Sequence, residues 1–275
     1  MADVDRVYVL DAMANRVTAL RTLDGSVEWM AGSHGGGPRE FSKPATIALS
    51  PLSEILVADP LNDRIAVLDL NGNFRSLIRL SGLGYPVSMC PLADSTIVLT
   101  LLTSGPPVIR IDRSGRVLHR NKLPWPNLED ANPLPTQSLL AGLPDGSGCV
   151  LALSLGVGFA RISDNQFNKP HSYVEHMDLP VSEQVTWNGR PMERLTKQQS
   201  AAKGVFAVGD SVVVPFGGES ADAGRLEDVY DVNSGRYLYT HRLPFWSART
   251  AIVGRRSYHL VTQDGYATIR AVERG

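Results

Sequence analysis

Short apolar segments separated by glycine-containing turn pairs run along almost the whole chain. Val7–Leu10 and Ile55–Ala58 are typical segments, and Asp24-Gly25, Asn71-Gly72 and Ser114-Gly115 are typical pairs. Apolar or alternating runs of this length indicate β-strands, and glycine pairs supply the positive φ that tight hairpins need. The 3.6-residue periodicity of amphipathic helices is nearly absent. The pattern predicts an all-β chain of antiparallel hairpins.

The hairpins repeat at a regular spacing. The strand and turn around Asp11 and Arg16 return around Asp59 and Arg64, 48 residues later. A shorter version of the same unit begins at Val229. Periods of about 40–50 residues, each with several short strands, are typical of the blades of a β-propeller.

The repeat divides the chain into six blades of up to four antiparallel strands, within one domain that covers residues 1–275. The expected blades are approximately 5–31, 45–82, 85–123, 137–179, 201–243 and 248–273, with an inserted loop at 180–200. Both terminal blades are incomplete, so we expect them to pair with each other and to bring the termini together. A five-bladed ring that merges both ends is the alternative.

The second blade carries a recognisable motif. Residues 37–44 read Gly-Pro-Arg-Glu-Phe-Ser-Lys-Pro, and the strand Ile55–Asp59, Asn62 and Arg64-Ile65 follow. This closely resembles the NHL repeat of the TolB-like/NHL superfamily of six-bladed propellers, with its pattern G-P-x-x-F-x-x-P, a strand, and V-A-D-x-x-N-x-R-I. The match is good over residues 7–72, roughly a quarter of the chain. Members of that family bind ligands, proteins or RNA, or catalyse reactions, so the resemblance does not select a function.

Charge and length exclude several classes of partner. The net charge is −1, whereas RNA-binding propellers of this type carry strongly basic faces, so no nucleic-acid partner is expected. No apolar run reaches the ~18–20 residues of a transmembrane helix, so membrane association would come only through a partner. The first residues do not resemble a signal peptide, which predicts a cytoplasmic protein. A periplasmic or extracellular location is the alternative if an upstream segment has been removed.

Catalytic chemistry is not predicted. Propeller lactonases hold a divalent cation with Asp, Asn and Glu near the inner strands, and hard cations need several oxygen ligands at once. The expected inner strands contain no Asp, Glu, Asn or His: they are 45–49, 86–90, 137–141, 204–208 and 249–253. The amidating lyase among NHL-like proteins needs converging histidines, and the 6 histidines here are dispersed. We therefore expect no catalytic residue, metal or cofactor.

Two sets of residues have structural interpretations. Asp59 with Arg64, and Asp11 with Arg16, flank the same loop in two blades, and each pair is expected to brace it by a charge-assisted hydrogen bond. Cys90 and Cys149 lie in apolar segments 59 residues apart, which predicts buried free thiols, although a disulfide is possible.

Loop lengths distinguish the two faces of the expected propeller. One face has tight turns, whereas the other carries long connections at 32–44, 123–137, 180–200, 217–225 and 243–248. Long loops on a rigid scaffold carry function, and Trp and Arg are frequent at interface hot spots. The candidate partner-binding residues on this face are His34, Arg39, Trp125, Trp187, Arg190 and Trp246. An equal alternative is that the tryptophans cover gaps between blades.

The segment 180–200 is expected to form an ordered arm on the long-loop face. Asn188-Gly189 predicts a turn, and Met192–Gln199 after Pro191 predicts a short helix. The leading interpretation is a non-catalytic binding or scaffold propeller for a protein partner, such as an accessory subunit of a larger complex. The alternatives are a hydrolase or lactonase with an atypical site, and a sensor that binds a small ligand in the channel.

Overall fold

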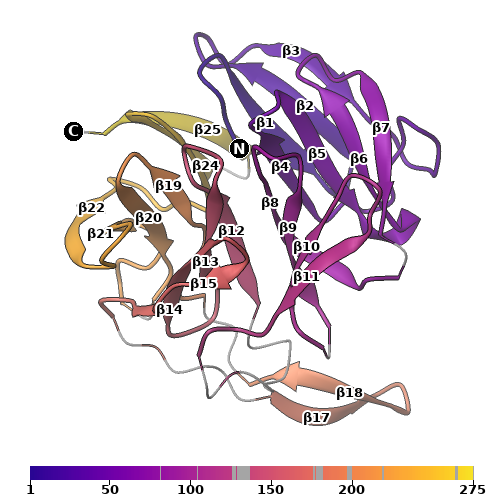
Figure 1. The fold of residues 1–275 in the computed structure, drawn as a ribbon. Coiled ribbons are helices and arrows are strands. Elements are labelled where there is room, and N and C mark those ends of the chain that lie inside the picture. The colour runs from indigo at the N-terminus through magenta and orange to yellow at the C-terminus, as the bar shows by residue number, and fades with distance from the viewer. Residues whose placement is uncertain are drawn as a thin grey trace.

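The computed structural model of the chain describes residues 1–80, 82–103, 105–125, 128, 137–175, 177, 182–196, 200–218, 220–263 and 266–274. These residues form six small antiparallel sheets arranged as the blades of a propeller, and a separate two-stranded hairpin (Figure 1). The predicted all-β, six-bladed propeller with incomplete terminal blades is confirmed. The five-bladed alternative is wrong, because the first and last sheets are separate.

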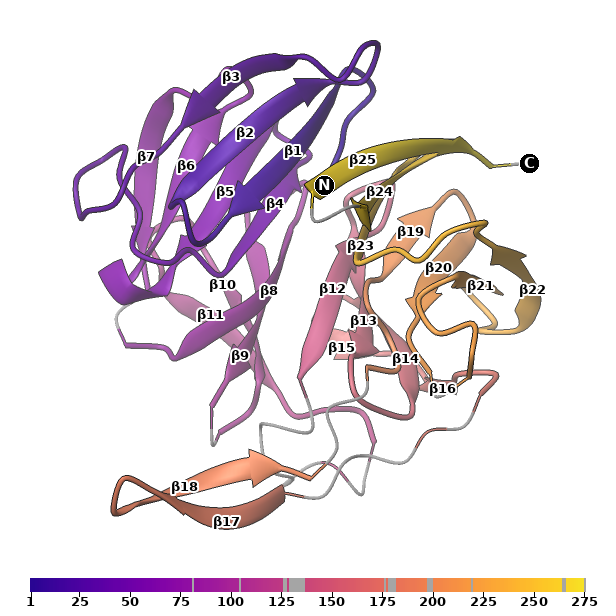
Figure 2. The same cartoon turned by 180° about the vertical axis from the view of Figure 1, so that it is seen from behind.

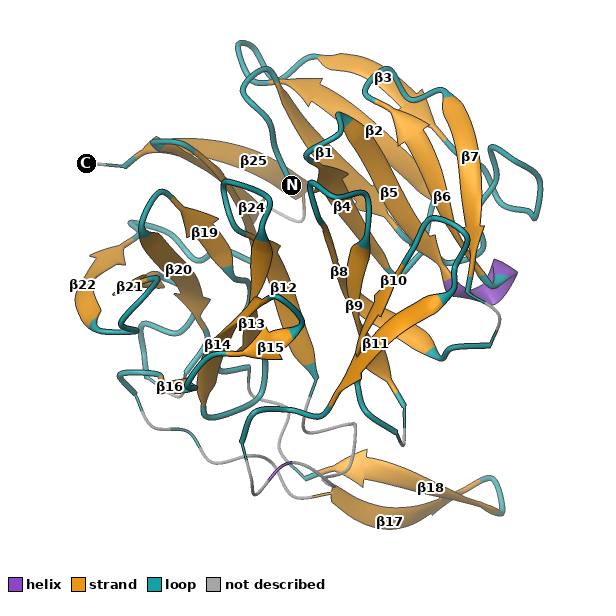
Figure 3. Cartoon of the chain, viewed as in Figure 1, coloured by secondary structure: helices purple, strands orange, loops and turns teal. Residues whose placement is uncertain are grey.

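The first two blades carry the repeated motif. Blade 1 consists of β1 (Arg6–Asp11), β2 (Arg16–Arg21) and β3 (Val27–Ala31). Blade 2 consists of β4 (Thr46–Ser50), β5 (Glu54–Asp59), β6 (Arg64–Asp69) and β7 (Phe74–Arg79). The short 3-10 turn η1 (Pro60–Asn62) joins β5 to β6 (Figure 3).

The next two blades have complete sets of strands. Blade 3 consists of β8 (Tyr85–Pro91), β9 (Ile97–Leu102), β10 (Val108–Ile111) and β11 (Val117–Asn121). Blade 4 consists of β12 (Ser138–Gly142), β13 (Gly148–Leu153), β14 (Gly158–Ser163) and the two short strands β15 (Gln166–Phe167) and β16 (His171–Ser172). Both short strands pair with β14, so together they form a broken outer strand.

The last two blades follow the inserted hairpin. Blade 5 consists of β19 (Phe206–Val208), β20 (Ser211–Phe216), β21 (Leu226–Asp231) and β22 (Tyr237–Arg242). Blade 6 consists of β23 (Arg249–Val253), β24 (Arg256–Gln263) and β25 (Tyr266–Glu273). The inner strands of successive blades are neighbours: β4 with β8, β8 with β12, β12 with β19, and β19 with β23.

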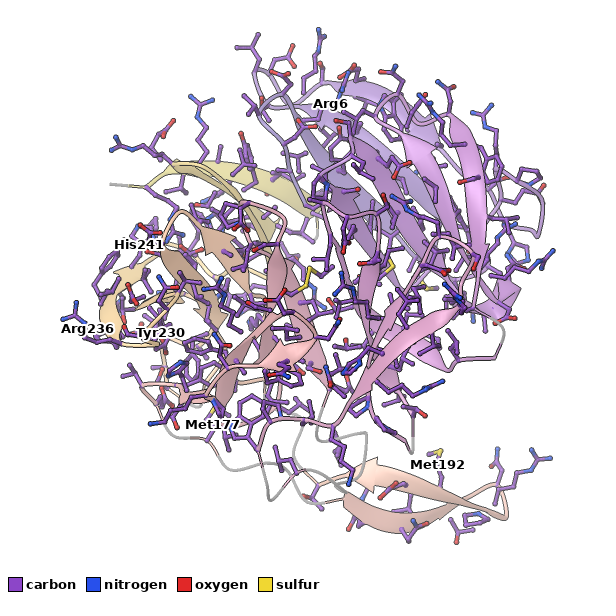
Figure 4. The ribbon with its side chains drawn as sticks, viewed as in Figure 1. Arg6, Met177, Met192, Tyr230, Arg236 and His241 are labelled. Carbon is purple, nitrogen blue, oxygen red and sulfur yellow. A yellow bond between two sulfur atoms is a disulfide. The ribbon has the colours of Figure 1, made fainter. Side chains whose placement is uncertain are left out.

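Apolar side chains fill the spaces between adjacent blades, as the alternation of each strand requires. The cluster between blades 4 and 5 contains Phe159, Phe216 and Tyr230, and Tyr230 is labelled in Figure 4. The cluster between blades 1 and 2 contains Tyr8 and Phe41. Burial of these faces is the main stabilising contribution, because each sheet alone leaves a large apolar surface in water.

The ring closes by side-chain packing. Val7 and Val9 on β1 contact Ala251 and Tyr258 of blade 6, and no strand of blade 1 pairs with a strand of blade 6 in the described residues. The expected pairing of terminal blades is therefore wrong. Residues 1–2 lie along β1 instead, where Tyr8 N–H donates to the carbonyl oxygen of Met1 at 2.8 Å. Figures 1 and 2 show the N-terminus near the centre, whereas β25 runs outward and ends at Glu273 near the outer edge, so the described ends of the chain are not adjacent.

The inserted segment between blades 4 and 5 forms a β-hairpin. Strands β17 (Ser182–Trp187) and β18 (Arg190–Leu195) pair over their full length. Asn188 (φ 48°) and Gly189 (φ 75°) form the predicted turn, because both central residues have the positive φ of a type I′ turn. The predicted helix is wrong over residues 192–195, which are strand, and residues 197–199 lie outside the described residues. A matched hairpin pairs the backbone groups that face each other along both strands, which outweighs the weak helix signal after Pro191.

A disulfide joins blade 3 to blade 4. Cys90 on β8 and Cys149 on β13 have their sulfur atoms 2.14 Å apart and their Cα atoms 6.5 Å apart. The bond is drawn between the two sulfur atoms in Figure 4. The expected free thiols are therefore wrong, because the ring brings together two strands that are distant in the sequence.

No helix within the described ranges has the length and apolar character needed to cross a lipid bilayer.

Candidate binding face and central channel

One buried arginine fixes the long loop between β3 and β4, which carries two of the predicted binding residues. Arg64, 5% exposed, begins β6 and donates from Nη2 to the carbonyl oxygens of Gly37 at 2.8 Å and Glu40 at 2.7 Å. Its Nη1 donates to the carbonyl oxygen of Gly36 at 3.1 Å. A guanidinium has five donors in a rigid fork, so one side chain can satisfy several loop carbonyls together.

Asp59 completes this brace from the end of β5. It is fully buried, and its Oδ2 accepts from Arg64 Nε at 3.1 Å and from Asn62 Nδ2 at 2.7 Å. Its Oδ1 accepts the backbone N–H of Ser42 at 2.8 Å. The structural interpretation of the Asp59 and Arg64 pair is confirmed, and the braced segment includes the 32–44 loop as well as the β5–β6 connection.

The equivalent pair in blade 1 does not form a brace. Asp11 Oδ1 accepts the backbone N–H of Ala14 at 2.8 Å, no ion pair joins Asp11 to Arg16, and Arg16 Nε is buried with no hydrogen-bond partner among the described residues. The expectation for this pair is wrong. Asn15 fixes the loop here, because its Oδ1 accepts the backbone N–H of Lys43 at 2.6 Å.

The outer surface of the braced loop presents His34 and Arg39 to solvent. His34 forms an isolated parallel bridge with Phe41, whose side chain is fully buried and anchors the loop. Phe41, the phenylalanine of the motif, therefore anchors the loop from inside the core, while His34 and Arg39 remain accessible to solvent.

Trp125 has a different role from His34 and Arg39. It is partly buried and packs against the apolar cluster between blades 3 and 4, which includes Leu123, Leu128 and Leu140. This position fits the alternative interpretation, in which a tryptophan covers a gap between blades.

The hairpin β17–β18 carries two more predicted residues. Trp187 and Arg190 are paired across its turn, and Arg190 is exposed, whereas the side chain of Trp187 lies outside the described residues. Met192 on β18 is 47% exposed and is labelled in Figure 4. Figures 1 and 2 show the hairpin apart from the six blades in both views.

Trp246 lies in the connection between β22 and β23 and is 45% exposed. The Lys203 ammonium lies 4.3 Å from the centroid of its ring, a cation–π distance. Gly224 (φ +76°) supports this stack, since a Cβ there would lie 2.5 Å from Trp246 Nε1 and 2.6 Å from Lys203 Nζ. The backbone at Gly224 therefore lets both side chains pack against it.

The six predicted residues thus come from four separate connections. His34 and Arg39 share one loop, Trp187 and Arg190 share the hairpin, and Trp125 and Trp246 stand alone. All four connections join the outer strand of one blade to the next blade, and antiparallel blades place such connections on one face of a propeller. The fold therefore gives these residues a common face, but the described side chains do not form one compact site.

The central channel contains two cavities that the sequence interpretation did not identify. One has a volume of about 380 Å³ and lies toward the long-loop face, where Lys203 and Arg249 line it. The other, about 410 Å³, lies toward the opposite face and shares with the first Leu140, Val205 and Phe206. Metal-binding side chains in the inner strands are the only sequence signal for a channel site, and Lys203, which precedes β19, and Arg249, which begins β23, do not belong to that class.

A buried polar network fills part of the space between blades 5 and 6. Glu227 on β21 is fully buried and accepts hydrogen bonds from Arg274 Nη1 and, at 3.2 Å, from His241 Nδ1. Its Oε1 lies 4.0 Å from Nε2 of His259, and His259 Nδ1 lies 3.3 Å from Ser247 Oγ. Figure 4 labels His241 at this position.

The network contains the residue types of a nucleophilic triad, but its burial prevents that chemistry. His259 is fully buried and Ser247 is 4% exposed, so a substrate cannot reach the hydroxyl. Burial lowers the pKa of His259, an effect that Glu227 opposes and that Arg274 and His241 reinforce. His259, held between the hydroxyls of Ser247 and Ser257, therefore serves packing.

Among the residues with described positions, no group of three or more His, Cys, Asp and Glu side chains could hold a metal ion. The expected absence of a catalytic metal or cofactor stays a prediction.

No family model matches the chain, and no curated protein matches it. Solved structures do resemble it. A protein of unknown function from Bacteroides caccae has a TM-score of 0.58 with 13% identity, over 98% of this chain and 90% of that one. Virginiamycin B lyase from Staphylococcus aureus has a TM-score of 0.53 with 12% identity, over 92% of this chain and 87% of that one.

A streptogramin B lyase has a TM-score of 0.58 with 14% identity, over 98% of this chain and 80% of that one. At these identities the likeness shows the propeller fold alone, because one fold hosts many activities.

Proposed function

We propose that this chain is a non-catalytic propeller module that binds a protein partner through its long-loop face, as an accessory subunit of a larger assembly. The observation that carries the proposal is the hairpin β17–β18, a regular paired element inserted between two blades and exposed on that face. Long ordered insertions on a compact scaffold are typically functional.

The hairpin has the physical features of a docking arm. An isolated two-stranded hairpin is marginally stable in water, and no strand in the described part of the chain pairs with either of its outer edges. Met192 and Arg190 add an exposed apolar side chain and an exposed guanidinium, two residue types enriched at interfaces. A partner that covers the hairpin would bury the methionine and satisfy the open edges.

The NHL-repeat family is part of the proposal. The motif at residues 37–44 supports it, because these residues form the loop between β3 and β4. The brace of Asp59, Asn62 and Arg64 also supports it, because these polar residues of the same motif hold that loop in place. Conversely, the pair Asp11 and Arg16 departs from this arrangement.

Two observations favour binding over catalysis. The residues of the channel cavities include no carboxylate or histidine in the described part of the chain, and the Ser247, His259 and Glu227 network is sealed from solvent. The likeness to lyases does not weigh against this proposal, since it is a likeness of fold.

The disulfide bears on where the protein works. Disulfides persist in secreted and periplasmic proteins and are rare in the reducing cytosol, so the Cys90–Cys149 bond supports the periplasmic or extracellular alternative over the cytoplasm. When the cells are lysed in denaturant with an alkylating agent and without reductant, mass spectrometry of the purified chain should find neither cysteine alkylated. Alkylation of both cysteines would support the cytoplasm.

The hairpin variant Arg190→Glu/Met192→Asp tests the docking proposal. Both side chains are exposed, so folding should be unaffected, whereas a reversed charge and a buried carboxylate should weaken an interface by about tenfold or more. The measurement is the equilibrium dissociation constant for the partner that co-purifies with the native protein.

Leu23→Asp is the matched control. Leu23 is 90% exposed in the β2–β3 turn, on the opposite face of the propeller, so this variant should bind the partner as the unmodified chain does. Equal affinity of the hairpin variant and the unmodified chain would refute the docking arm.

A further inference from the structure

Two positive charges stand at one end of the channel, and no acidic side chain in the described part of the chain pairs with them. In the described residues neither Lys203 nor Arg249 forms an ion pair: the ammonium of Lys203 lies on Trp246, and Arg249 Nη1 donates to the carbonyl oxygen of Ala248 at 3.0 Å. Both line the cavity of about 380 Å³, and no Asp or Glu is among its described lining residues. The channel mouth on the long-loop face is therefore electropositive.

The two cations are close enough to repel each other. Burial lowers the pKa of Lys203, and the charge of Arg249 lowers it further. A nearby anion would offset both effects, because it favours the charged form of the amine. The aromatic ring of Trp246 and the close backbone at Gly224 hold the ammonium at this position, so the charge is placed before any ligand arrives.

Below the mouth, the cavity walls are apolar. Ile47, Leu139, Leu140, Val205 and Phe206 come from three inner-strand regions and line the same space. The polar side chains below the mouth are hydroxyls such as those of Thr46, Ser88 and Thr250, and Ser88 Oγ already accepts the backbone N–H of Leu140 at 2.9 Å. A small inorganic anion would leave these walls in contact with water, and a cation would be repelled at the mouth.

We propose that the channel binds a small organic anion with an apolar body, its carboxylate between Lys203 and Arg249 and its body along the inner strands. The volume is within the lower part of the range of ligand pockets, about 300–1,000 Å³. This site lies in the channel mouth beside the proposed interface and is tested without the protein partner, so either proposal can fail alone.

Isothermal titration calorimetry with octanoate and 2-naphthoate tests the inference. At least one should bind with one molecule per chain. The neutral analogue octanol and the cation octyltrimethylammonium should bind at least about tenfold more weakly, because they lack the charge-assisted hydrogen bonds.

Lys203→Met and Arg249→Gln remove the charges while preserving most of the side-chain volume. Each should weaken binding of the anion by about tenfold, and octanol should bind as before. Arg75→Gln removes an exposed cation on β7 and is the matched control, so it should change neither the affinity for the anion nor the affinity for octanol. Thr46→Phe should obstruct the cavity and abolish binding, with thermal unfolding used to confirm that each variant folds.

Three results would overturn the inference: no binding of either anion, octanol binding as tightly as octanoate, or full affinity in the Lys203→Met/Arg249→Gln double variant. If Lys203→Met does not fold, Lys203→Gln and Arg249→Gln give the same comparison.

Discussion

The buried side chain of Arg64 holds the long loop between β3 and β4 in one conformation. Arg64 satisfies three loop carbonyl oxygens and the carboxylate of Asp59, so loop and sheet are fixed together. The sequence indicated the pairing of Asp59 and Arg64 because the two positions are opposite each other across a short connection. It could not indicate the loop carbonyls, which approach Arg64 only once the chain has folded.

Arg64→Met should be strongly destabilising. It leaves the fully buried carboxylate of Asp59 without its cation and removes the donors of three carbonyl oxygens, which predicts a loss of about 3–5 kcal/mol in the free energy of unfolding. Urea unfolding followed by circular dichroism measures this. Arg75→Met removes an exposed cation near Asp69 and should change stability by no more than about 0.5 kcal/mol. A similar small effect of both substitutions would contradict the brace.

His259 should make the fold less stable in acid. Burial lowers its pKa below the ordinary value of 6.5, so as the pH falls the unfolded chain takes up a proton before the folded chain does. Stability is therefore present above about pH 6.5 and is lost as the pH falls through the folded-state pKa. Three charged or titratable groups face the same imidazole: Glu227 raises the pKa of His259, whereas Arg274 and His241 lower it.

The readout is the free energy of unfolding in urea between about pH 7.5 and 5. His259→Gln should reduce the decline, whereas His119→Gln, at an exposed position, should leave it unchanged. A decline of equal size in His259→Gln and the unmodified chain would place the titrating group elsewhere.

At the scale of elements, local signals predicted strands well and contacts between sheets poorly. The Asn188-Gly189 turn was visible because two residues with positive φ specify it. The pairing of Ser182–Trp187 with Arg190–Leu195 was missed because the helix-forming residues after Pro191 outweighed a short, mostly polar strand in the interpretation. The disulfide between Cys90 and Cys149 was not predicted, because the two cysteines lie in different blades and only the folded ring brings them together.

The Cys90–Cys149 bond should contribute substantially to stability. It spans 59 residues and links two blades, so replacing both cysteines with alanine should cost about 2–4 kcal/mol. Thermal unfolding should show a lower midpoint for the double variant, and reductant should lower the midpoint of the unmodified chain alone. No difference between oxidised chain and variant would contradict a contribution from the bond.

At the scale of the whole molecule, the ring creates sites that no segment of the sequence contains. Lys203 and Arg249 are far apart in the chain and precede or begin inner strands of different blades, and only the ring places them at one cavity. The asymmetry between faces was predictable, since it follows from loop length. The way the ring closes was not predictable, because the packing of Val7 against Ala251 and Tyr258 has no sequence signal comparable to the hairpin repeats.

The most direct test of the proposed function is hydrogen–deuterium exchange of backbone amides in the free protein and in its complex with the co-purified partner. The docking proposal predicts slower exchange in the complex over residues 182–195 and in the loops 32–44 and 243–248 of the same face. Exchange in the opposite turns, such as those at Leu23 and Asn71-Gly72, should be unchanged. Protection confined to those opposite turns or to the outer strands, with the hairpin exchanging as in the free protein, would contradict the account.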